Sequence, residues 1–181
     1  CKCKLVSGKV KELTDKSYLL SKEELQQNMI LGCQSIAKSD VIIELPNNSS
    51  QQQECIGTII EQRGLTHNIS EIVISLDTPI DFIPGQYAQL SAVNQQFPER
   101  CYSFAHGSNA DGNTTISFIV KAVPNGKMSN WLFSAEALGT LVNVKASFGD
   151  FYLRSNQSPM ICIAGGSGLG PLISILENAI I

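Results

Sequence analysis

The chain has 181 residues, of which 43% are hydrophobic and 16% charged, and its 13 basic and 16 acidic residues give a net charge of −3. This composition supports a packed core and excludes a disordered chain, and the lack of a basic run argues against a nucleic-acid binder. No apolar stretch approaches the roughly 18 residues of a membrane span. The chain starts on Cys1 and stops at Ile181 within an apolar, helix-like run, so we expect a fragment cut at both ends.

Six cysteines stand at positions 1, 3, 33, 55, 101 and 162. Three of them, Cys55, Cys101 and Cys162, lie in apolar or alternating runs, where buried free thiols are common. We therefore expect a reduced, cytoplasmic protein rather than a disulfide scaffold.

The first 45 residues combine strand-like runs with one short helix. Ser21-Lys22-Glu23-Glu24 has the pattern of a capping box and predicts a helix over 22–27. Strands are expected at Met29–Cys33 and Val41–Leu45. The polar stretch Pro46–Glu54 that follows is typical of a linker.

From Cys55 to Leu153 the pattern is a series of short β-rich runs separated by turn residues. A helix-like insert over 129–137 interrupts them. This pattern predicts a small antiparallel barrel. Its strands are expected at Ile56–Ile60, Glu71–Leu76, Tyr87–Val93, Cys101–Ala105, Ile116–Val123 and Leu141–Ala146.

The end of the chain has a different character. Met160–Ala164 is a continuous apolar run, and glycines and an apolar helix start follow it. This order predicts a strand over 160–164 that opens a parallel βαβ unit, the start of an α/β domain.

Two short motifs in the barrel region carry residues suited to binding an anion. In Arg100-Cys101-Tyr102-Ser103, Tyr102 and Ser103 point to opposite faces of an unbent strand. About 25 residues further on, Gly126-Lys127-Met128-Ser129 opens the short helix, where free N–H groups and a hydroxyl can meet an anion. Each motif alone also fits an ordinary strand or an ordinary helix cap.

Together and in this order, the motifs resemble the flavin signature of the ferredoxin-reductase family, R-x-Y-S followed by P-x-G-x-x-S. Pro84-Gly85-Gln86-Tyr87 and the segment 148–153, FGDFYL, are similar to two further segments of that family. The resemblance covers nearly all of residues 55–181. It implies an antiparallel six-stranded barrel that binds FAD, in a mainly β protein.

The resemblance also implies a role for each matching residue. Arg100 would pair with the FAD pyrophosphate, Tyr102 would pack against the isoalloxazine ring, and Ser103 would lie near flavin N5 to assist hydride arrival. Tyr102 and Ser103 are thus the expected catalytic residues. Further contacts would come from a strand and a turn, namely Ile119, Val120, Lys121, Gly126, Lys127, Met128 and Ser129.

A glycine-rich turn follows the run 160–164. Residues 165–171, GGSGLGP, resemble the G-G-T-G-x-x-P turn at which the same family binds nicotinamide, with Ser167 in place of the usual threonine. The resemblance implies NADH or NADPH as a substrate, held close to Gly166, Ser167 and Gly168. The choice between the two nucleotides is not encoded in this segment.

The first segment resembles the second half of a plant-type 2Fe-2S ferredoxin, which has a β-grasp fold. By this resemblance Cys1 and Cys33 are the third and fourth ligands of the cluster, and Cys3 is a neighbour that does not bind iron. Two of the four ligands would then lie outside this sequence. Two unrelated buried thiols are the alternative interpretation.

The order of these parts resembles the reductase components of bacterial oxygenases, and the stretch VPNGKMSNWL is especially similar to benzoate-type ring-hydroxylating dioxygenase reductases. That layout implies transfer of electrons from NAD(P)H through FAD and a 2Fe-2S cluster to a terminal oxygenase component or another acceptor. The expected parts are a ferredoxin-like piece over 1–45, a linker over 46–54, the FAD-binding barrel over 55–156 and the start of a nucleotide-binding domain over 157–181.

Three alternatives remain open at this point. Methane- and phenol-monooxygenase reductases share the layout. A deoxysugar-pathway or flavohaemoprotein-like reductase would share residues 55–181 without the pattern of Cys1 and Cys33. A non-enzymatic β-barrel binding module would explain the strands but not the ordered motifs.

Overall fold

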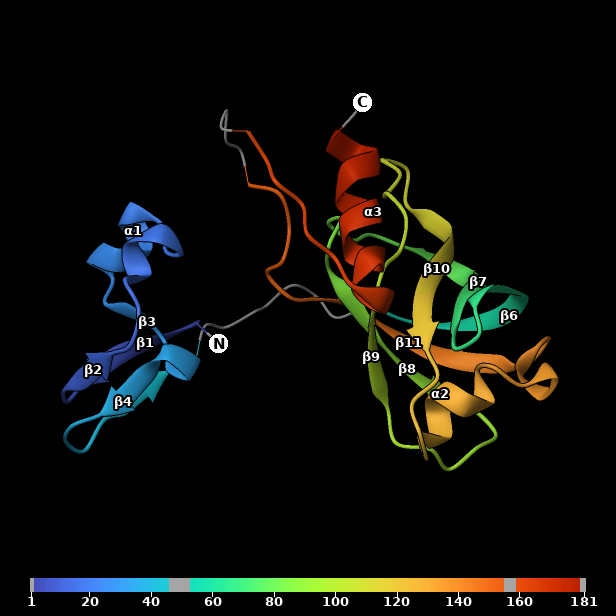
Figure 1. Ribbon diagram of the computed structural model, residues 1–181, viewed down its shortest axis with the longest axis horizontal. Coiled ribbons are helices and arrows are strands. Elements are labelled where there is room, and N and C mark those ends of the chain that lie inside the picture. The colour runs from blue at the N-terminus through green and yellow to red at the C-terminus, as the bar shows by residue number, and fades with distance from the viewer. Residues whose placement is uncertain (1, 46–52, 155–158, 180–181) are drawn as a thin grey trace. The chain divides into compact units, whose positions relative to one another are not determined.

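The computed structural model describes residues 2–45, 53–154 and 159–179. It divides the chain into two compact units, Cys1–Ser49 and Ser50–Ile181, which are shown as ribbons in Figure 1. Most of the expected linker, residues 46–52, lies outside the described residues, and Gln53 and Glu54 already belong to the first strand of the second unit. Among the described residues, no helix is both long and apolar enough to cross a membrane.

The first unit contains two small antiparallel sheets and one helical turn. The strands β3 (Met29–Leu31), β1 (Lys2–Ser7) and β5 (Ile42–Glu44) form a three-stranded sheet in that order, and β2 (Val10–Glu12) pairs with β4 (Ser35–Ala37). The 3₁₀ turns η1 (Lys16–Tyr18) and η2 (Gly32–Gln34) and the helix α1 (Lys22–Gln26) connect them. The strand expected at Met29–Cys33 ends at Leu31 in the structure, and Cys33 lies in the following turn η2.

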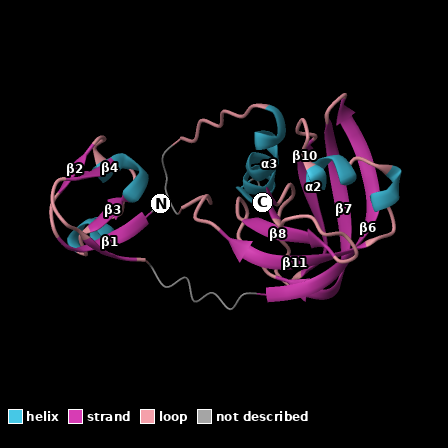
Figure 2. Ribbon diagram, turned by 90° about the horizontal axis from the view of Figure 1, so that it is seen from below, coloured by secondary structure: helices cyan, strands magenta, loops and turns pink. Residues whose placement is uncertain are grey.

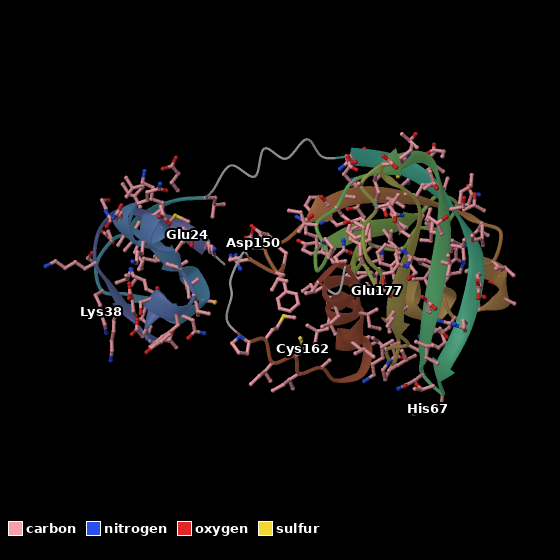
Figure 3. All side chains as sticks on the ribbon, turned by 90° about the horizontal axis from the view of Figure 1, so that it is seen from above. Glu24, Lys38, His67, Asp150, Cys162 and Glu177 are labelled. Atoms are coloured by element: carbon pink, nitrogen blue, oxygen red, sulfur yellow. The ribbon has the colours of Figure 1, made fainter. Side chains whose placement is uncertain are left out.

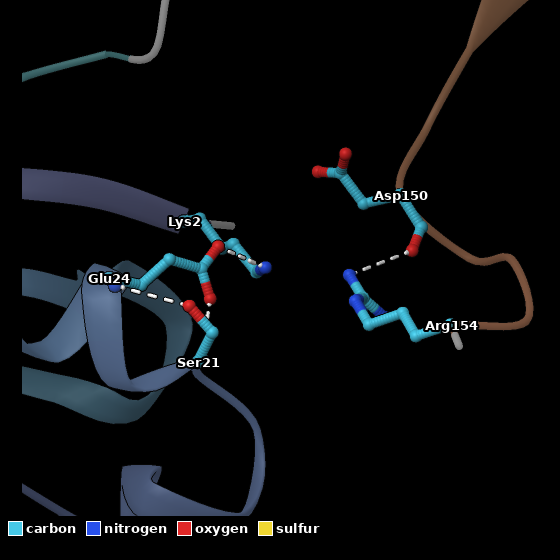
Figure 4. Close-up of polar contacts among 5 residues, drawn as sticks. All are labelled: Lys2, Ser21, Glu24, Asp150 and Arg154. Atoms are coloured by element: carbon cyan, nitrogen blue, oxygen red, sulfur yellow. Dashed lines mark hydrogen bonds and ion pairs between the residues drawn. The ribbon is translucent and has the colours of Figure 1, made fainter. Parts of the chain in front are cut away.

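The predicted capping box at the start of α1 is confirmed (Figure 4). The Ser21 hydroxyl accepts the Glu24 N–H at 3.2 Å, and the Glu24 carboxylate accepts the Ser21 N–H at 2.8 Å. The other carboxylate oxygen of Glu24 pairs with Lys2 Nζ at 2.6 Å. The box satisfies N–H groups that a helix start leaves without partners, and the ion pair ties α1 to β1.

The second unit is a six-stranded antiparallel sheet that curls into a barrel (Figure 2). Its strand order is β10-β7-β6-β11-β8-β9, as the prediction of an antiparallel six-stranded barrel requires. The strands are β6 (Gln53–Thr66), β7 (Ile69–Ile80), β8 (Tyr87–Ala92), β9 (Arg100–Ser103), β10 (Asn113–Lys121) and β11 (Leu141–Phe148).

The hairpin of β6 and β7 extends well beyond the strands expected from sequence. Residues 61–66 pair with residues 69–73 of β7, although nearly all of 61–66 are exposed and polar. This extension is held by backbone pairing and by polar contacts of Gln62 and Arg63 rather than by an apolar face. It therefore lacks the alternation that marks a half-buried strand.

The barrel closes where its two edge strands meet. Phe104, directly after β9, forms an isolated antiparallel bridge with Phe118 of β10, and the Ala105 N–H donates to the Ser117 carbonyl at 2.9 Å. Phe104 is fully buried and stacks on Phe82 at a centroid distance of 3.8 Å, with Phe118 at 5.4 Å. The closure therefore coincides with an aromatic cluster in the core.

The expected helix over 129–137 is two shorter pieces in the structure. The helix α2 covers Lys127–Trp131, and the 3₁₀ turn η3 covers Ala135–Ala137. Met128, Trp131, Leu132 and Ala137 are buried in the barrel core. The helical insert thus covers one end of the barrel and presents its start, Gly126, at the surface of that end.

The prediction of a strand over 160–164 is wrong in this structure. These residues have no regular secondary structure, and Ile161 and Ile163 are 87% and 89% exposed. A parallel strand needs a neighbouring strand for its backbone hydrogen bonds, and none lies beside it within residues 53–154 and 159–179. The expected helix after the glycines is present, as the 3₁₀ turn η4 (Gly166–Gly168) and α3 (Leu169–Ala179).

Candidate functional site

The strand β9 presents the R-x-Y-S residues at an edge of the barrel. Within the six-stranded sheet it pairs with β8 alone, so its other edge lies toward β10. Arg100 is exposed, and its guanidinium donates to the Glu99 carbonyl at 2.8 Å. Four of the five guanidinium N–H donors are left over by that single bond. Arg100 therefore offers a charged donor at the barrel surface.

Tyr102 and Ser103 lie on opposite faces of β9, as the strand pattern predicts. Tyr102 pairs with the buried Ala88 and Ser103 with Tyr87. The ring of Tyr102 is half-buried and lies 6.2 Å from that of Phe118. Burial raises the pKa of the Tyr102 hydroxyl to about 12, and the nearby Arg100 opposes that rise. The hydroxyl therefore stays protonated at neutral pH.

The turn before α2 is built around Gly126. Its N–H donates to the Val123 carbonyl at 2.8 Å, and Asn125 adopts a positive φ of 62°. A Cβ atom on Gly126 would lie 2.5 Å from Ser129 Oγ and 3.1 Å from the Val123 oxygen. The turn is therefore too tight for a side chain at this position.

The side chains of Met128 and Ser129, at the start of α2, both point into the protein. Met128 is 2% exposed and packs in the core. Ser129 is 7% exposed, and its hydroxyl accepts the Val123 N–H at 3.2 Å and donates to the Gly126 carbonyl at 3.5 Å. What this turn offers to a ligand is thus the backbone N–H groups of the first helical residues, which have no partner inside the helix. A direct bond from the Ser129 hydroxyl to a ligand stays a prediction.

The expected flavin-lining residues of β10 alternate in burial. Ile119 is half-buried, Val120 is fully buried and Lys121 is exposed. In the sheet β10 pairs with β7 alone, apart from the bridge between Phe118 and Phe104. Its free edge and the free edge of β9 therefore face each other across the closure of the barrel.

The glycine-rich turn lies against the same part of the barrel. Gly166 has a positive φ of 57°, and a Cβ atom there would lie 3.8 Å from Ile69 of β7. A Cβ on Gly170, at the start of α3, would lie 3.6 Å from the Cβ atoms of both Ala105 and Ile119. Figure 2 shows α3 beside β10. The structure thus brings the predicted nicotinamide turn next to the predicted flavin strand.

Several polar residues at this junction escaped the sequence analysis. His106 is half-buried, with Nδ1 3.0 Å from the hydroxyl of the buried Ser117. Ser174, Glu177 and Asn178 of α3 bind the backbone of residues 106–108. Their partners are about 70 positions away in the chain, and no local pattern marks such contacts.

The described residues include one of the two expected cluster ligands. Cys1 lies outside them, and Cys33 is disulfide-bonded. A cluster would need Cys33 as a thiolate. The part of the chain that the structure describes holds no group of three or more metal-binding side chains. The roles of Cys1 and Cys33 as cluster ligands therefore remain predictions.

The three cysteines expected to be buried thiols, Cys55, Cys101 and Cys162, are not fully buried. Cys55 is half-buried, and burial together with the nearby Asp77 raises its pKa to about 11, whereas Cys101 and Cys162 are exposed. Because the thiolate is the reactive form, a thiol-alkylating reagent at about pH 8 should modify Cys101 and Cys162 well before Cys55. Mass spectrometry of a labelling time course measures this order. Modification of Cys55 first would contradict it.

Comparison with known proteins identifies the family. Residues 57–152 match the family described as "Oxidoreductase FAD-binding domain". The chain is 39% identical, over 98% of its length, to the xylene/toluene monooxygenase electron transfer component of Pseudomonas putida, and 33% identical, also over 98%, to the toluate 1,2-dioxygenase electron transfer component of the same species.

A solved structure agrees with the sequence matches. The structure described as ferredoxin reductase in carbazole 1,9a-dioxygenase superposes with a TM-score of 0.68 and 29% identity, and covers 99% of this chain and 55% of that one. The chain spans about half the length of the curated relatives it matches, 51% and 54% for the two named above. With more than half of its residues inside the family match, the chain belongs to the oxidoreductase FAD-binding domain family.

Proposed function

We propose that this chain is part of an electron-transfer reductase that takes electrons from NAD(P)H, passes them through FAD and a 2Fe-2S cluster, and delivers them to an oxygenase component. The observation that carries the proposal is that α3, directly after the glycine-rich turn, packs on Ala105, two residues after the R-x-Y-S strand, and on Ile119 of the strand expected to line the flavin. The relatives named above are electron transfer components of oxygenases. The proposed parts keep the expected order of a ferredoxin-like piece, a linker, the FAD-binding barrel and the start of a nucleotide-binding domain, with the barrel beginning at Gln53.

The described residues fit FAD. Its pyrophosphate needs a cation and N–H donors; Arg100 is exposed with spare donors, and Gly126 keeps the α2 turn clear of side-chain bulk. The flat ring system of the flavin needs an apolar wall, and the half-buried ring of Tyr102, 6.2 Å from the ring of Phe118 on β10, would supply one. When bound, FAD supplies the exchange between two-electron and one-electron chemistry.

The protein's own residues then have distinct tasks. Arg100 and the backbone of Lys127 and Met128 hold the pyrophosphate. Tyr102 holds the flavin ring, and its raised pKa keeps it neutral there. Ser103 would place a hydroxyl near flavin N5, as the resemblance implies. The turn Gly166–Gly168 admits the nicotinamide because it carries no large side chain.

We assign the first unit to the ferredoxin part on the order of its elements. The match to the relative named first above, which covers 98% of this chain, includes this unit. A 2Fe-2S cluster takes four ligands, and this chain supplies two candidates, Cys1 and Cys33. The chain therefore does not form the cluster site by itself, and no electron-transfer step within it is derived. A cytoplasmic location agrees with such a role. The identity of the oxygenase substrate, aromatic acid or hydrocarbon, lies with the partner.

The proposal is tested on the complete purified protein. After removal of unbound small molecules, its visible spectrum should show flavin bands together with the broad absorption of a 2Fe-2S centre. Addition of NADH or NADPH without oxygen should bleach the flavin bands. A colourless protein that takes up no FAD would contradict the proposal. Flavin absorption without the cluster bands would restrict the proposal to a reductase that uses FAD without a 2Fe-2S cluster.

A glycine substitution tests the α2 turn. Gly126→Ala should weaken FAD binding about tenfold, because the added Cβ forces Ser129 and the Val123 carbonyl away and distorts the donors of the turn. Gly64→Ala is the matched control, since a Cβ there meets no atom within 4 Å. Titration of flavin-free protein with FAD measures both. Equal affinities for the two variants would remove the turn from the pyrophosphate site.

A further inference from the structure

A set of hydrogen bonds joins α3 to the loop that directly follows the flavin strand. The Gly107 N–H donates to the Glu177 carboxylate at 2.7 Å, and the Ser108 N–H donates to Asn178 Oδ1 at 3.0 Å. The Asn178 amide in turn donates to the Ser108 carbonyl at 3.3 Å. The buried Ser174 hydroxyl donates to the His106 carbonyl at 2.7 Å. We call Ser174, Glu177 and Asn178 with the backbone of residues 106–108 the α3 clamp.

The clamp occupies one face of the helix. Positions 170, 174, 177 and 178 recur at helical spacing, so they lie along one side of α3. Gly170 packs on Ala105 and Ile119 near the start of that face, and Glu177 meets the loop near its end (Figure 3). Gly107 fits closely under the helix, since a Cβ there would lie 2.2 Å from Asn178 Oδ1. Contacts near both ends fix the helix in position and in rotation.

The loop in the clamp is itself fixed to the flavin side of the barrel. Residues 106–108 follow Ser103 after only two residues, Phe104 and Ala105, both buried at the closure. His106 also contacts Ser117 of β10 through its ring. The clamp thus connects the two strands expected to line the flavin with the helix whose N-terminus carries the glycine-rich turn.

We propose that Glu177, supported by Asn178 and Ser174, is a positioning residue for hydride transfer: it fixes the glycine-rich turn, through α3, relative to the strand that carries Tyr102 and Ser103. This inference rests on the proposed function. Reacting atoms must approach within a few tenths of an ångström of their productive separation, and a misplacement of about 1 Å costs about 100-fold in rate. None of the residues proposed to hold the FAD pyrophosphate lies on α3, so loss of the clamp should leave FAD binding intact.

The test uses the complete, FAD-loaded protein and anaerobic stopped-flow reduction by NADH. Glu177→Ala should lower the limiting rate constant of FAD reduction about tenfold, with unchanged FAD content. Glu177→Gln keeps an amide oxygen that accepts the Gly107 N–H, and should restore the rate to within about twofold. Gly107→Ala, which breaks the clamp from the loop side, should resemble Glu177→Ala.

Glu136→Ala is the matched control, because the Glu136 side chain is exposed on η3 and makes no hydrogen bond or ion pair within the described residues. A merely structural role predicts a lower melting temperature and lower FAD content, with a normal rate in the loaded fraction. That result, or a rate within twofold of wild type for both Glu177→Ala and Gly107→Ala, would overturn the inference. Failure of both NADH and NADPH to reduce the wild-type flavin would instead overturn the proposed function, and this inference with it.

Discussion

Replacing Arg100 with alanine should weaken FAD binding about 10- to 100-fold, the loss expected when a charge-assisted hydrogen bond is removed. Arg100 is exposed at the barrel edge, and only the Glu99 carbonyl accepts from it among the described residues. Its removal therefore leaves no buried group without a partner, and the fold should be unaffected. FAD titration of the flavin-free protein measures the affinity, and thermal unfolding without FAD checks the fold.

Two variants separate a direct contact from a general effect of charge. Lys145→Ala also removes one positive charge, but Lys145 pairs with Gln89 while Arg100 pairs with Leu90, so the two side chains leave opposite faces of the sheet. FAD affinity should be nearly unchanged in Lys145→Ala. Arg100→Lys should fall between wild type and Arg100→Ala, because lysine keeps the charge without the paired donors. Equal losses in Lys145→Ala and Arg100→Ala would argue against the pyrophosphate contact.

The second large effect concerns closure of the barrel. Phe104→Ala should lower the free energy of unfolding of the barrel by about 3–5 kcal/mol, since it empties a fully buried site. The Phe104 ring also stacks on Phe82, and its backbone bridges to Phe118 of β10 at the closure of the barrel. Urea unfolding followed by the fluorescence of Trp131 reports on this unit alone, because Trp131 is the single tryptophan of the chain and lies in α2.

Phe151→Ala is the control for this experiment, because Phe151 is 57% exposed and loses far less buried surface. Phe151→Ala should lower the free energy of unfolding by less than about 1 kcal/mol. A Phe104→Ala variant as stable as Phe151→Ala would show that the closure contributes little to the barrel.

The sequence predicts most of the barrel because alternation and turn residues are local signals. Runs such as Glu71–Leu76 and Leu141–Ala146 are rich in β-branched residues and largely alternate, and the structure contains both within longer strands. The polar extension over 61–66 gives no such signal, since its pairing depends on β7 alone. The strand over 160–164 failed for the opposite reason: its composition is that of a buried strand, but it lacks a neighbour to pair with among the described residues.

The residues of the candidate site also fall into two groups: those that local sequence patterns identify and those that only the folded structure reveals. The motif residues Arg100, Tyr102 and Gly126 could be named because they stand in fixed local patterns. The inward position of the Ser129 hydroxyl follows from the tight turn at Gly126, which only the folded backbone shows. The contacts of His106 and Glu177 are long-range, and their residue types are common on any surface. Local patterns thus identify ligand-binding motifs but not the contacts that hold these motifs in place.

The central claim, that this barrel binds FAD through its pyrophosphate and its ring, is tested most directly by calorimetric titration of the flavin-free protein with FAD and, separately, with riboflavin. We expect one FAD to bind per chain, with a dissociation constant near or below about 1 μM. Riboflavin, which has the ring but no pyrophosphate, should bind at least about tenfold more weakly, because Arg100 and the α2 turn lose their ligand. No binding of FAD, or equal binding of FAD and riboflavin, would contradict the account.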